Sequence, residues 1–144
     1  MEILNRKANF NYEILERIEC GIVLKGTEIK SIRMGKANIK DSYGIIKNNE
    51  VFILNMHISP YDNGGVFNHE ETRTRKLLLH KKEILKLKNK LDLDGFTLIP
   101  LKLYFVHDKA KIELGLCRGK KLYDKRESVK KRDVEREIAK KYKA

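Results

Sequence analysis

The residues of this chain best suited to chemistry are lysines and arginines near its C-terminal end. Residues 118–144 contain twelve Lys or Arg against five Asp or Glu, so +7 of the chain's net charge of +12 lies there. Arginine binds phosphate through two parallel hydrogen bonds, lysine adds a compact charge, and an aromatic ring stacks on an unpaired base. The first part of this segment combines these residue types in Lys120, Lys121, Tyr123, Lys125 and Arg126. The pattern predicts binding to a polyanion, with nucleic acid as the leading candidate.

A second basic group stands in the middle of the chain. Arg73, Arg75 and Lys76 come directly before the apolar run Leu77–Leu79, which is expected to belong to a strand. Charges at the rim of a rigid body can hold phosphates without ordering a long segment. We therefore expect this group to face the same polyanion, with Tyr43 as a further candidate for stacking on an unpaired base.

Residues that could support catalysis or hold a metal are scattered along the chain. The four histidines are His57, His69, His80 and His107, and His69-Glu70-Glu71 lacks the second histidine that a helical zinc site needs four residues away. No glycine-rich phosphate loop is present, and the serines lack the surroundings of a nucleophile. The sequence therefore predicts a binding protein with no catalytic residue, no metal site and no cofactor.

Alternating apolar and polar residues predict the strands that must position the basic groups. Tyr12–Leu24 alternates over a length expected of one long strand that curves around a barrel. Asn48 and Asn49 tolerate positive φ and are predicted to turn a hairpin between residues 42–47 and 50–58. Phe96–Val106 and Ala110–Cys117 are predicted to form a second hairpin. The core faces expected for the long strand and for the first arm of the second hairpin are Tyr12, Ile14, Ile18, Cys20, Ile22 and Leu24, and Ile99, Leu101, Leu103 and Phe105.

Two helices are predicted between the strands. Thr27 is expected to cap a short helix that ends at Gly35. A second helix is expected from about His80 to Leu93, ended by Gly95, and its core stripe is Ile84, Leu87 and Leu91. Residues 1–11 show no periodicity and are expected to form a polar lead.

Together these elements predict a mainly β fold: an OB-like antiparallel β-barrel with two or three flanking α-helices and a basic C-terminal tail. Residues 1–118 are expected to form the barrel and residues 119–144 the tail. No run reaches the roughly 18–20 apolar residues of a membrane span. Cys20 and Cys117 stand at core positions and suit a reducing compartment. We therefore expect a cytoplasmic protein that does not associate with a membrane.

The predicted tail has too few apolar residues to form a core. Asp124 followed by Glu127 resembles a capping box, and pairs of opposite charge four residues apart each support a helix by about 0.2–0.5 kcal/mol. These contributions are small for an isolated helix. The tail is therefore expected to be disordered when free and to become helical against a polyanion.

Six motifs, taken in their order along the chain, point to one known family. They are Asn5–Ala8, Glu19–Ser31, Arg33–Ile39, Asp41–Tyr43, Thr72–Leu79 and Gly119–Glu127. In this order they closely resemble small protein B, the bacterial SsrA-binding protein that partners transfer-messenger RNA (tmRNA). Because the match spans nearly the whole chain in separated motifs, it is far more specific than a single short motif.

The resemblance implies a non-enzymatic RNA-binding adaptor of trans-translation. Such a protein binds the tRNA-like domain of tmRNA and delivers it to stalled ribosomes. By likeness, Asn5, Glu19 and Leu78 match positions important for the RNA contact, while Lys7 and Arg73 are added from charge alone. The resemblance also implies a monomer that joins elongation factor Tu in the delivery complex.

For the tail, the resemblance implies entry into the small ribosomal subunit when no codon is present. There the tail would occupy the decoding centre and the mRNA channel and contact rRNA. The residues expected to make this contact are Gly119, Lys120, Lys121, Tyr123, Asp124, Lys125 and Arg126. Two other interpretations stay open on the charge pattern, an RNA-processing nuclease and a structural RNA-binding protein of the ribosome.

Overall fold

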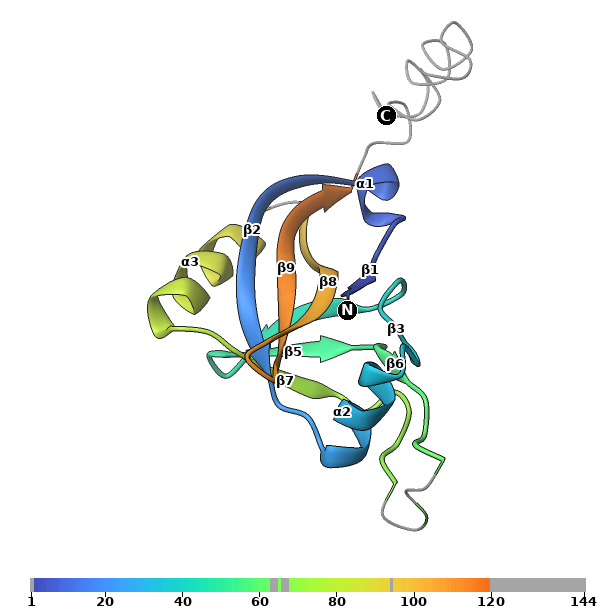
Figure 1. Cartoon of the computed structure of the whole chain (residues 1–144). Helices are drawn as coiled ribbons and strands as arrows, with labels where there is room; N and C mark the ends of the chain where they lie inside the picture. The colour runs from blue at the N-terminus through green and yellow to red at the C-terminus, as the bar shows by residue number, and fades with distance from the viewer. Residues whose placement is uncertain (1, 63–64, 66–67, 94, 120–144) are drawn as a thin grey trace, which may run out of the picture.

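The computed structural model describes residues 2–62, 65, 68–93 and 95–119. The predicted tail residues after Gly119 lie outside them. Within the described residues the elements follow one another as β1 (Glu2–Leu4), α1 (Ala8–Asn11), β2 (Tyr12–Ile22), α2 (Gly26–Arg33), β3 (Ala37–Asn38), β4 (Tyr43–Lys47), β5 (Glu50–Leu54), β6 (His57–Ile58), β7 (Arg75–Leu78), α3 (Lys81–Leu91), β8 (Phe96–Val106) and β9 (Lys109–Gly119) (Figure 1).

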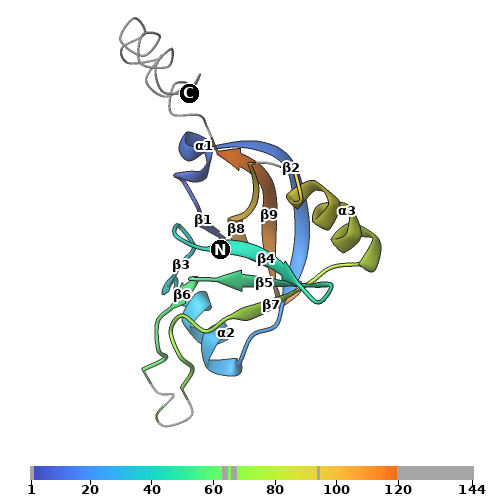
Figure 2. The same ribbon diagram turned by 180° about the vertical axis from the view of Figure 1, so that it is seen from behind.

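Antiparallel pairing closes the strands into a barrel. The strands follow the order β8-β4-β5-β7-β2-β9, and β9 pairs again with β8 to complete the ring. β1 pairs with β8 outside the ring, and β3 pairs with β6 in a small separate sheet. The predicted OB-like antiparallel barrel is confirmed, with α1, α2 and α3 as its flanking helices (Figures 1 and 2).

The turns and the longest helix follow the sequence closely. Asn48 and Asn49 both have positive φ, at 53° and 61°, and form the predicted hairpin turn between β4 and β5. Gly35 and Gly95, with φ of 75° and 83°, follow α2 and α3. Along α3 the predicted stripe of Ile84, Leu87 and Leu91 packs on the barrel core, which confirms that face of the helix.

The core face predicted for β2 is wrong only at the start of the strand, at Tyr12 and Ile14. The register of β2 against β9 shifts between Ile14 and Glu16, which marks a bulge. An extra residue in one strand turns every later side chain to the opposite face. Ile18 therefore faces the main core with Cys20 and Ile22, whereas Ile14 packs on the outside of the barrel with Tyr12.

The first arm of the second hairpin departs from prediction for the same reason. β8 shifts its register against β9 between Pro100 and Lys102. Leu98 and Leu103 enter the main core, whereas Ile99 and Leu101 join a second apolar cluster on the outer face, with Ala8, Cys117, Tyr12 and Ile14. This outer cluster fixes α1 against the barrel.

The N-terminal segment and the start of α2 also differ from prediction. Residues 1–11 were expected to form an irregular lead, but β1 and α1 lie within them. Thr27 does not cap α2, because its hydroxyl lies 2.9 Å from His69 Nδ1. Instead the helix start is held by Glu28, whose Oε1 accepts a hydrogen bond of 2.7 Å from the Lys25 amide.

Both cysteines are free and buried, as their predicted core positions require. Burial raises the pKa of the Cys20 thiol to about 12 and that of the Cys117 thiol to about 11. Both are therefore neutral thiols that serve as small apolar core residues.

Candidate RNA-binding surface

Strand pairing brings two of the predicted contact residues to one face of the barrel. Leu78 pairs with Gly21 across β7 and β2, and Gly21 pairs with Lys111 across β2 and β9. Glu19 stands two residues before Gly21, so the two share a face of the strand. Leu78 is 51% exposed and lies over Gly21, where an added Cβ would be 3.3 Å from the Leu78 Cβ. We call the exposed side of β2, β9 and β8 around Glu19 the outer sheet face.

Tyr104 holds the Glu19 carboxylate in place on this face. It pairs with Lys111 across β8 and β9, and its hydroxyl donates a hydrogen bond to Glu19 Oε2. Burial, together with this hydrogen bond, raises the pKa of the Tyr104 hydroxyl, which therefore remains a donor. Sequence reasoning missed Tyr104 and Lys111 as site residues. The predicted hairpin of residues 96–106 and 110–117 was the signal that could have placed them together.

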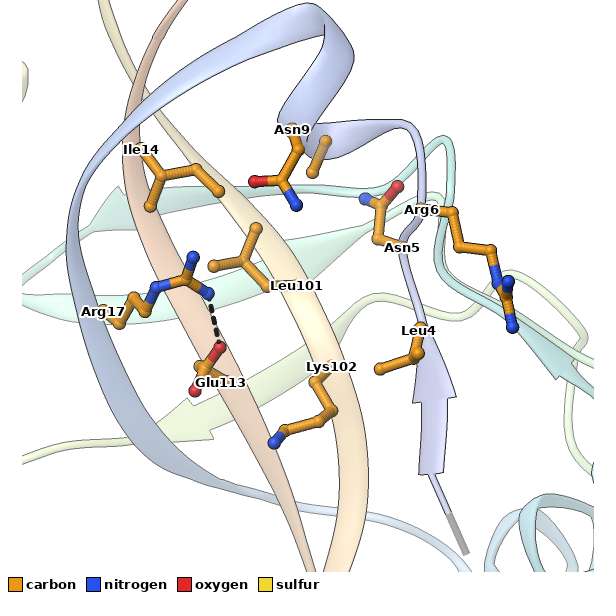
Figure 3. A pocket seen from close by; sticks show the side chains of 10 residues that line it. Leu4, Asn5, Arg6, Asn9, Ile14, Arg17, Leu101, Lys102 and Glu113 are labelled. Carbon is orange, nitrogen blue, oxygen red and sulfur yellow. Dashed lines mark hydrogen bonds and ion pairs between the residues drawn. The ribbon is translucent and has the colours of Figure 1, made fainter.

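A hollow of about 430 Å³ lies on the outer sheet face on the side of α1. Figure 3 shows Asn9 and Arg17 extending over the space between β2 and the segment of β1 and α1, while Arg6 points away. Beside this space, Arg17 Nη1 on β2 donates a hydrogen bond of 3.0 Å to Glu113 Oε1 on the neighbouring strand β9. The hollow is lined by Leu4, Asn5, Arg6, Ala8, Asn9, Ile14, Arg17, Leu101, Lys102 and Glu113. Polar and cationic groups beside apolar side chains suit the sugar and base of a nucleotide.

A second hollow, of about 480 Å³, lies at the Leu78 end of the same face. Its lining combines apolar side chains, including Val23 and Ile29, with Lys109 and Lys111. The two hollows lie on either side of Glu19 and Tyr104. The outer sheet face therefore offers positive charges, hydrogen-bond acceptors and apolar contacts along its length. Tyr43, the other candidate for base stacking, lies on β4 instead.

Asn5 lies inside the protein and does not present its amide to solvent. It is 6% exposed, and its Nδ2 donates hydrogen bonds of 3.0 Å to the Pro100 carbonyl and 3.4 Å to the Ile39 carbonyl. Its backbone amide donates to the Leu101 carbonyl at 2.9 Å. Asn5 thus ties the N-terminal segment to β8 and positions α1, whereas Lys7 directly before α1 is exposed.

The central basic group is not an open cluster of cations. Arg75 is fully buried, and its Nε and Nη1 donate hydrogen bonds of 2.6 Å to Glu28 Oε2 and the Met56 carbonyl. The prediction that Arg75 faces phosphate is therefore wrong. Arg73 Nη2 donates at 2.6 Å to Glu28 Oε1, and Lys76 forms an ion pair with Glu50.

Sequence reasoning missed Glu28, which organises this group. Its carboxylate is fully buried and joins α2 to the segment of Arg73 and Arg75. Burial by itself would raise the pKa of Glu28. The hydrogen bonds from Arg73, the Lys25 amide and Arg75 outweigh that effect and hold the pKa below its ordinary value. The glutamate is therefore charged at neutral pH and offsets one of the two positive charges that face it.

Gly119, the first of the residues predicted to contact the ribosome, is the last residue that the structure describes. Gly119 is exposed at the end of β9, where it pairs with Tyr12 directly after α1. The other six predicted ribosome-contact residues lie outside the described residues: Lys120, Lys121, Tyr123, Asp124, Lys125 and Arg126.

Within residues 2–62, 65, 68–93 and 95–119, no three or more His, Cys, Asp or Glu side chains come close enough to hold a metal ion. His57 and His69 point to different partners: His57 Nε2 lies 2.5 Å from Glu71 Oε2, and His69 Nε2 lies 2.9 Å from the Ile58 carbonyl. The helices in the same part of the chain are all too short or too polar to cross a membrane.

A family model described as SmpB protein matches residues 2–144. The chain belongs to the SmpB family. Relatives named SsrA-binding protein include one from Carboxydothermus hydrogenoformans, 60% identical over 136 residues, which are 94% of this chain and 91% of that protein. Another, from Staphylococcus haemolyticus, is 57% identical over 142 residues, 96% of this chain and 91% of that protein. The resemblance inferred from the motifs is confirmed.

The SmpB match extends to three-dimensional structure. A solved structure described as "tmRNA-SmpB: a journey to the center of the bacterial ribosome" contains a chain 46% identical to this one, with a TM-score of 0.74. The alignment covers 90% of this chain and 94% of that chain. The structural likeness to SmpB therefore extends over most of the chain.

Proposed function

We propose that this SmpB-family protein is a non-enzymatic RNA-binding adaptor of trans-translation. It binds the tRNA-like domain of tmRNA and brings it to stalled ribosomes. The observation that carries the proposal is the likeness over 90% of the chain to a protein solved as part of tmRNA-SmpB in the bacterial ribosome. The name SsrA-binding protein, shared by relatives up to 60% identical, supports it further.

The outer sheet face is the surface that suits this RNA best. Glu19 can accept hydrogen bonds from ribose hydroxyls or base amino groups, and Lys111 beside it can neutralise a phosphate. Leu78 offers an exposed apolar contact for a base or sugar. Lys7 lies exposed at the α1 end of the molecule and adds a positive charge. Arg73 is a weaker candidate because its guanidinium already binds Glu28.

The segment that starts at Gly119 supplies the ribosomal contact in this proposal. Its basic residues, with Tyr123 among them, enter the empty decoding centre and mRNA channel of the small subunit. There they bind rRNA through charge and stacking. The protein works in the cytoplasm as a monomer and joins elongation factor Tu in the delivery complex. The charge of the segment and the family likeness support this division between barrel and tail.

Filter binding of the full chain to tmRNA and to a structured RNA of equal length, at matched salt, tests the proposal. We expect tmRNA to bind more tightly, because charge alone attracts both RNAs equally. Glu19→Lys should reduce this preference, whereas Glu70→Lys makes the same charge change at an exposed site outside the outer sheet face and should keep it. Equal affinity of the unmodified protein for both RNAs would contradict the proposal, and cleavage of either RNA on adding Mg²⁺ would contradict the non-enzymatic role.

A further inference from the structure

α3 carries lysines of two kinds. Lys86 Nζ lies 3.2 Å from Glu16 Oε1, and Lys90 forms an ion pair with the same carboxylate, so these two lysines fasten α3 to β2. The remaining lysines of the helix are exposed and have no carboxylate within 4.0 Å among the described residues: Lys81, Lys82 and Lys88. Their charges are free to meet an external anion.

The positions of Lys81 and Lys82 do not favour the helix itself. Both stand in the first turn, where the helix dipole is positive and acidic side chains are stabilising. Glu83 already supplies such an acid, and its Oε1 accepts a hydrogen bond of 3.1 Å from the His80 amide. Lysines at the positive end of a helix dipole destabilise the helix, and Lys81 and Lys82 form no ion pair among the described residues that would offset this effect. Residues that are unfavourable for local stability are expected at functional sites.

Leu85 adds an apolar contact on the same side of the helix. It is 59% exposed, and it follows Lys81 by four residues and precedes Lys88 by three, so the three side chains are neighbours on the helix surface. Leu87, which is buried in the core, holds the opposite side of α3 to the barrel. The face is therefore presented on a rigid support.

α3 stands apart from the surface already described. Figures 1 and 2 both show α3 on one side of β2, with α1 and β1 on the other. A ligand held over the hollow beside α1 is thus separated from the lysines of α3 by β2. Contacts at the two places belong to different segments of a ligand, or to different ligands.

We propose that the α3 lysine face, made of Lys81, Lys82, Leu85 and Lys88, binds the phosphate backbone of an RNA segment that the outer sheet face does not hold. The proposal rests on the proposed function in one respect, that the ligand is RNA. Lysines are point charges without the fixed fork of arginine, so this contact reads charge and not sequence. Leu85 packs against the sugar between the phosphates.

Binding to a fluorescein-labelled RNA duplex without loops, followed by anisotropy over a range of salt concentrations, tests the α3 lysine face. The variant is the full chain with Lys81→Gln, Lys82→Gln and Lys88→Gln. The matched control removes three other exposed lysines that also form no ion pair among the described residues, by Lys25→Gln, Lys40→Gln and Lys47→Gln. Each lost phosphate contact lowers the slope of log K against log salt by about 0.7–0.9, so the α3 variant should lose roughly 2 from that slope. Its affinity at low salt should fall about tenfold relative to the control.

The outcomes separate the two proposals. An α3 variant with the same slope and affinity as the control would overturn the α3 proposal. The lysines would then be solvated charges or would bind an acidic protein instead of RNA. The same variant should lower the affinities for tmRNA and for the duplex by a common factor, because backbone contacts carry no sequence information. If the unmodified protein shows no preference for tmRNA while the α3 variant still loses duplex binding, the proposed function fails and the α3 proposal stands. Circular dichroism of each variant confirms that the helix remains folded.

Discussion

At the scale of single residues, the buried carboxylate of Glu28 does more for the fold than any of the exposed ion pairs. It accepts hydrogen bonds from Arg73, Arg75 and the Lys25 amide, and so joins α2 to the segment around β7. Arg75 is fully buried and depends on this one carboxylate for its charge balance. Removal of one member of such a group leaves the other as an uncompensated buried charge.

We expect Glu28→Ala to destabilise the protein by about 3–5 kcal/mol, because it leaves the Arg75 guanidinium buried without a counter-ion. Urea unfolding followed by circular dichroism measures this loss. Glu50→Ala is the matched control, because it removes a carboxylate whose partner Lys76 is half exposed. The control should cost less than about 1 kcal/mol. Equal losses in the two variants would show that the buried group contributes no more than a surface pair.

The lowered pKa of Glu28 also predicts how stability depends on pH. A carboxyl group whose pKa is lower in the folded state than in the unfolded state, where it is about 4.3, stabilises the protein above that pH. This contribution is lost as the pH falls through the folded-state pKa. Urea midpoints between pH 7 and pH 3 should therefore fall more steeply for the unmodified protein than for Glu28→Gln. Parallel curves would mean that Glu28 titrates alike in both states.

At the scale of elements, regular alternation of apolar and polar residues predicts the core face of a strand only where the strand has no bulge. β9 alternates regularly, whereas β2 and β8 do not. Ile112, Leu114 and Leu116 alternate without interruption, and all three enter the main core, as simple alternation requires. β2 and β8 pair with β9 on either side and each contains a bulge, so a single alternating face for either strand was wrong. Glu16, which interrupts the apolar series of β2, was the visible sign of that shift.

The candidate site was predictable to the extent that it depends on local pattern. Glu19 and Leu78 were placed through family likeness, but their proximity follows from pairing of β2 with β7, which no local spacing reveals. Arg75 was misplaced because a basic residue beside an apolar run looks the same whether it points outward or meets a buried acid. Glu28 lies 47 residues away from Arg75 in sequence, so only the folded chain brings the two together.

The outer apolar cluster that seats α1 depends on a residue without a side chain. An added Cβ at Gly115 would lie 2.8 Å from Leu101 Cδ1, so Gly115→Ala should push Leu101 out of place and cost about 1–3 kcal/mol. Gly119→Ala on the same strand meets nothing within 4 Å and serves as the control. Thermal unfolding of both variants measures the difference. Equal melting temperatures of the two variants would show that Leu101 can move aside for the added methyl group without loss of stability.

At the scale of the whole molecule, the proposed function divides the work: the barrel binds tmRNA, and the segment after Gly119 binds the ribosome. A chain that ends at Gly119 should keep its preference for tmRNA over a matched structured RNA. Both affinities should fall together, because the removed residues carry much of the positive charge. The same chain should fail to rescue ribosomes stalled on an mRNA without a stop codon in a reconstituted translation system. Loss of the preference for tmRNA would contradict the division of labour.

The central claim is that the outer sheet face holds the tRNA-like domain, and side-chain oxidation with mass spectrometry tests it most directly. Hydroxyl radicals report the exposure of Leu78 and Tyr104 on that face, with Met34, 55% exposed after α2, as the internal reference. The account predicts that the tRNA-like domain slows oxidation of Leu78 and Tyr104 relative to Met34. Unchanged oxidation of both residues in the complex, or protection of Met34 in their place, would contradict it.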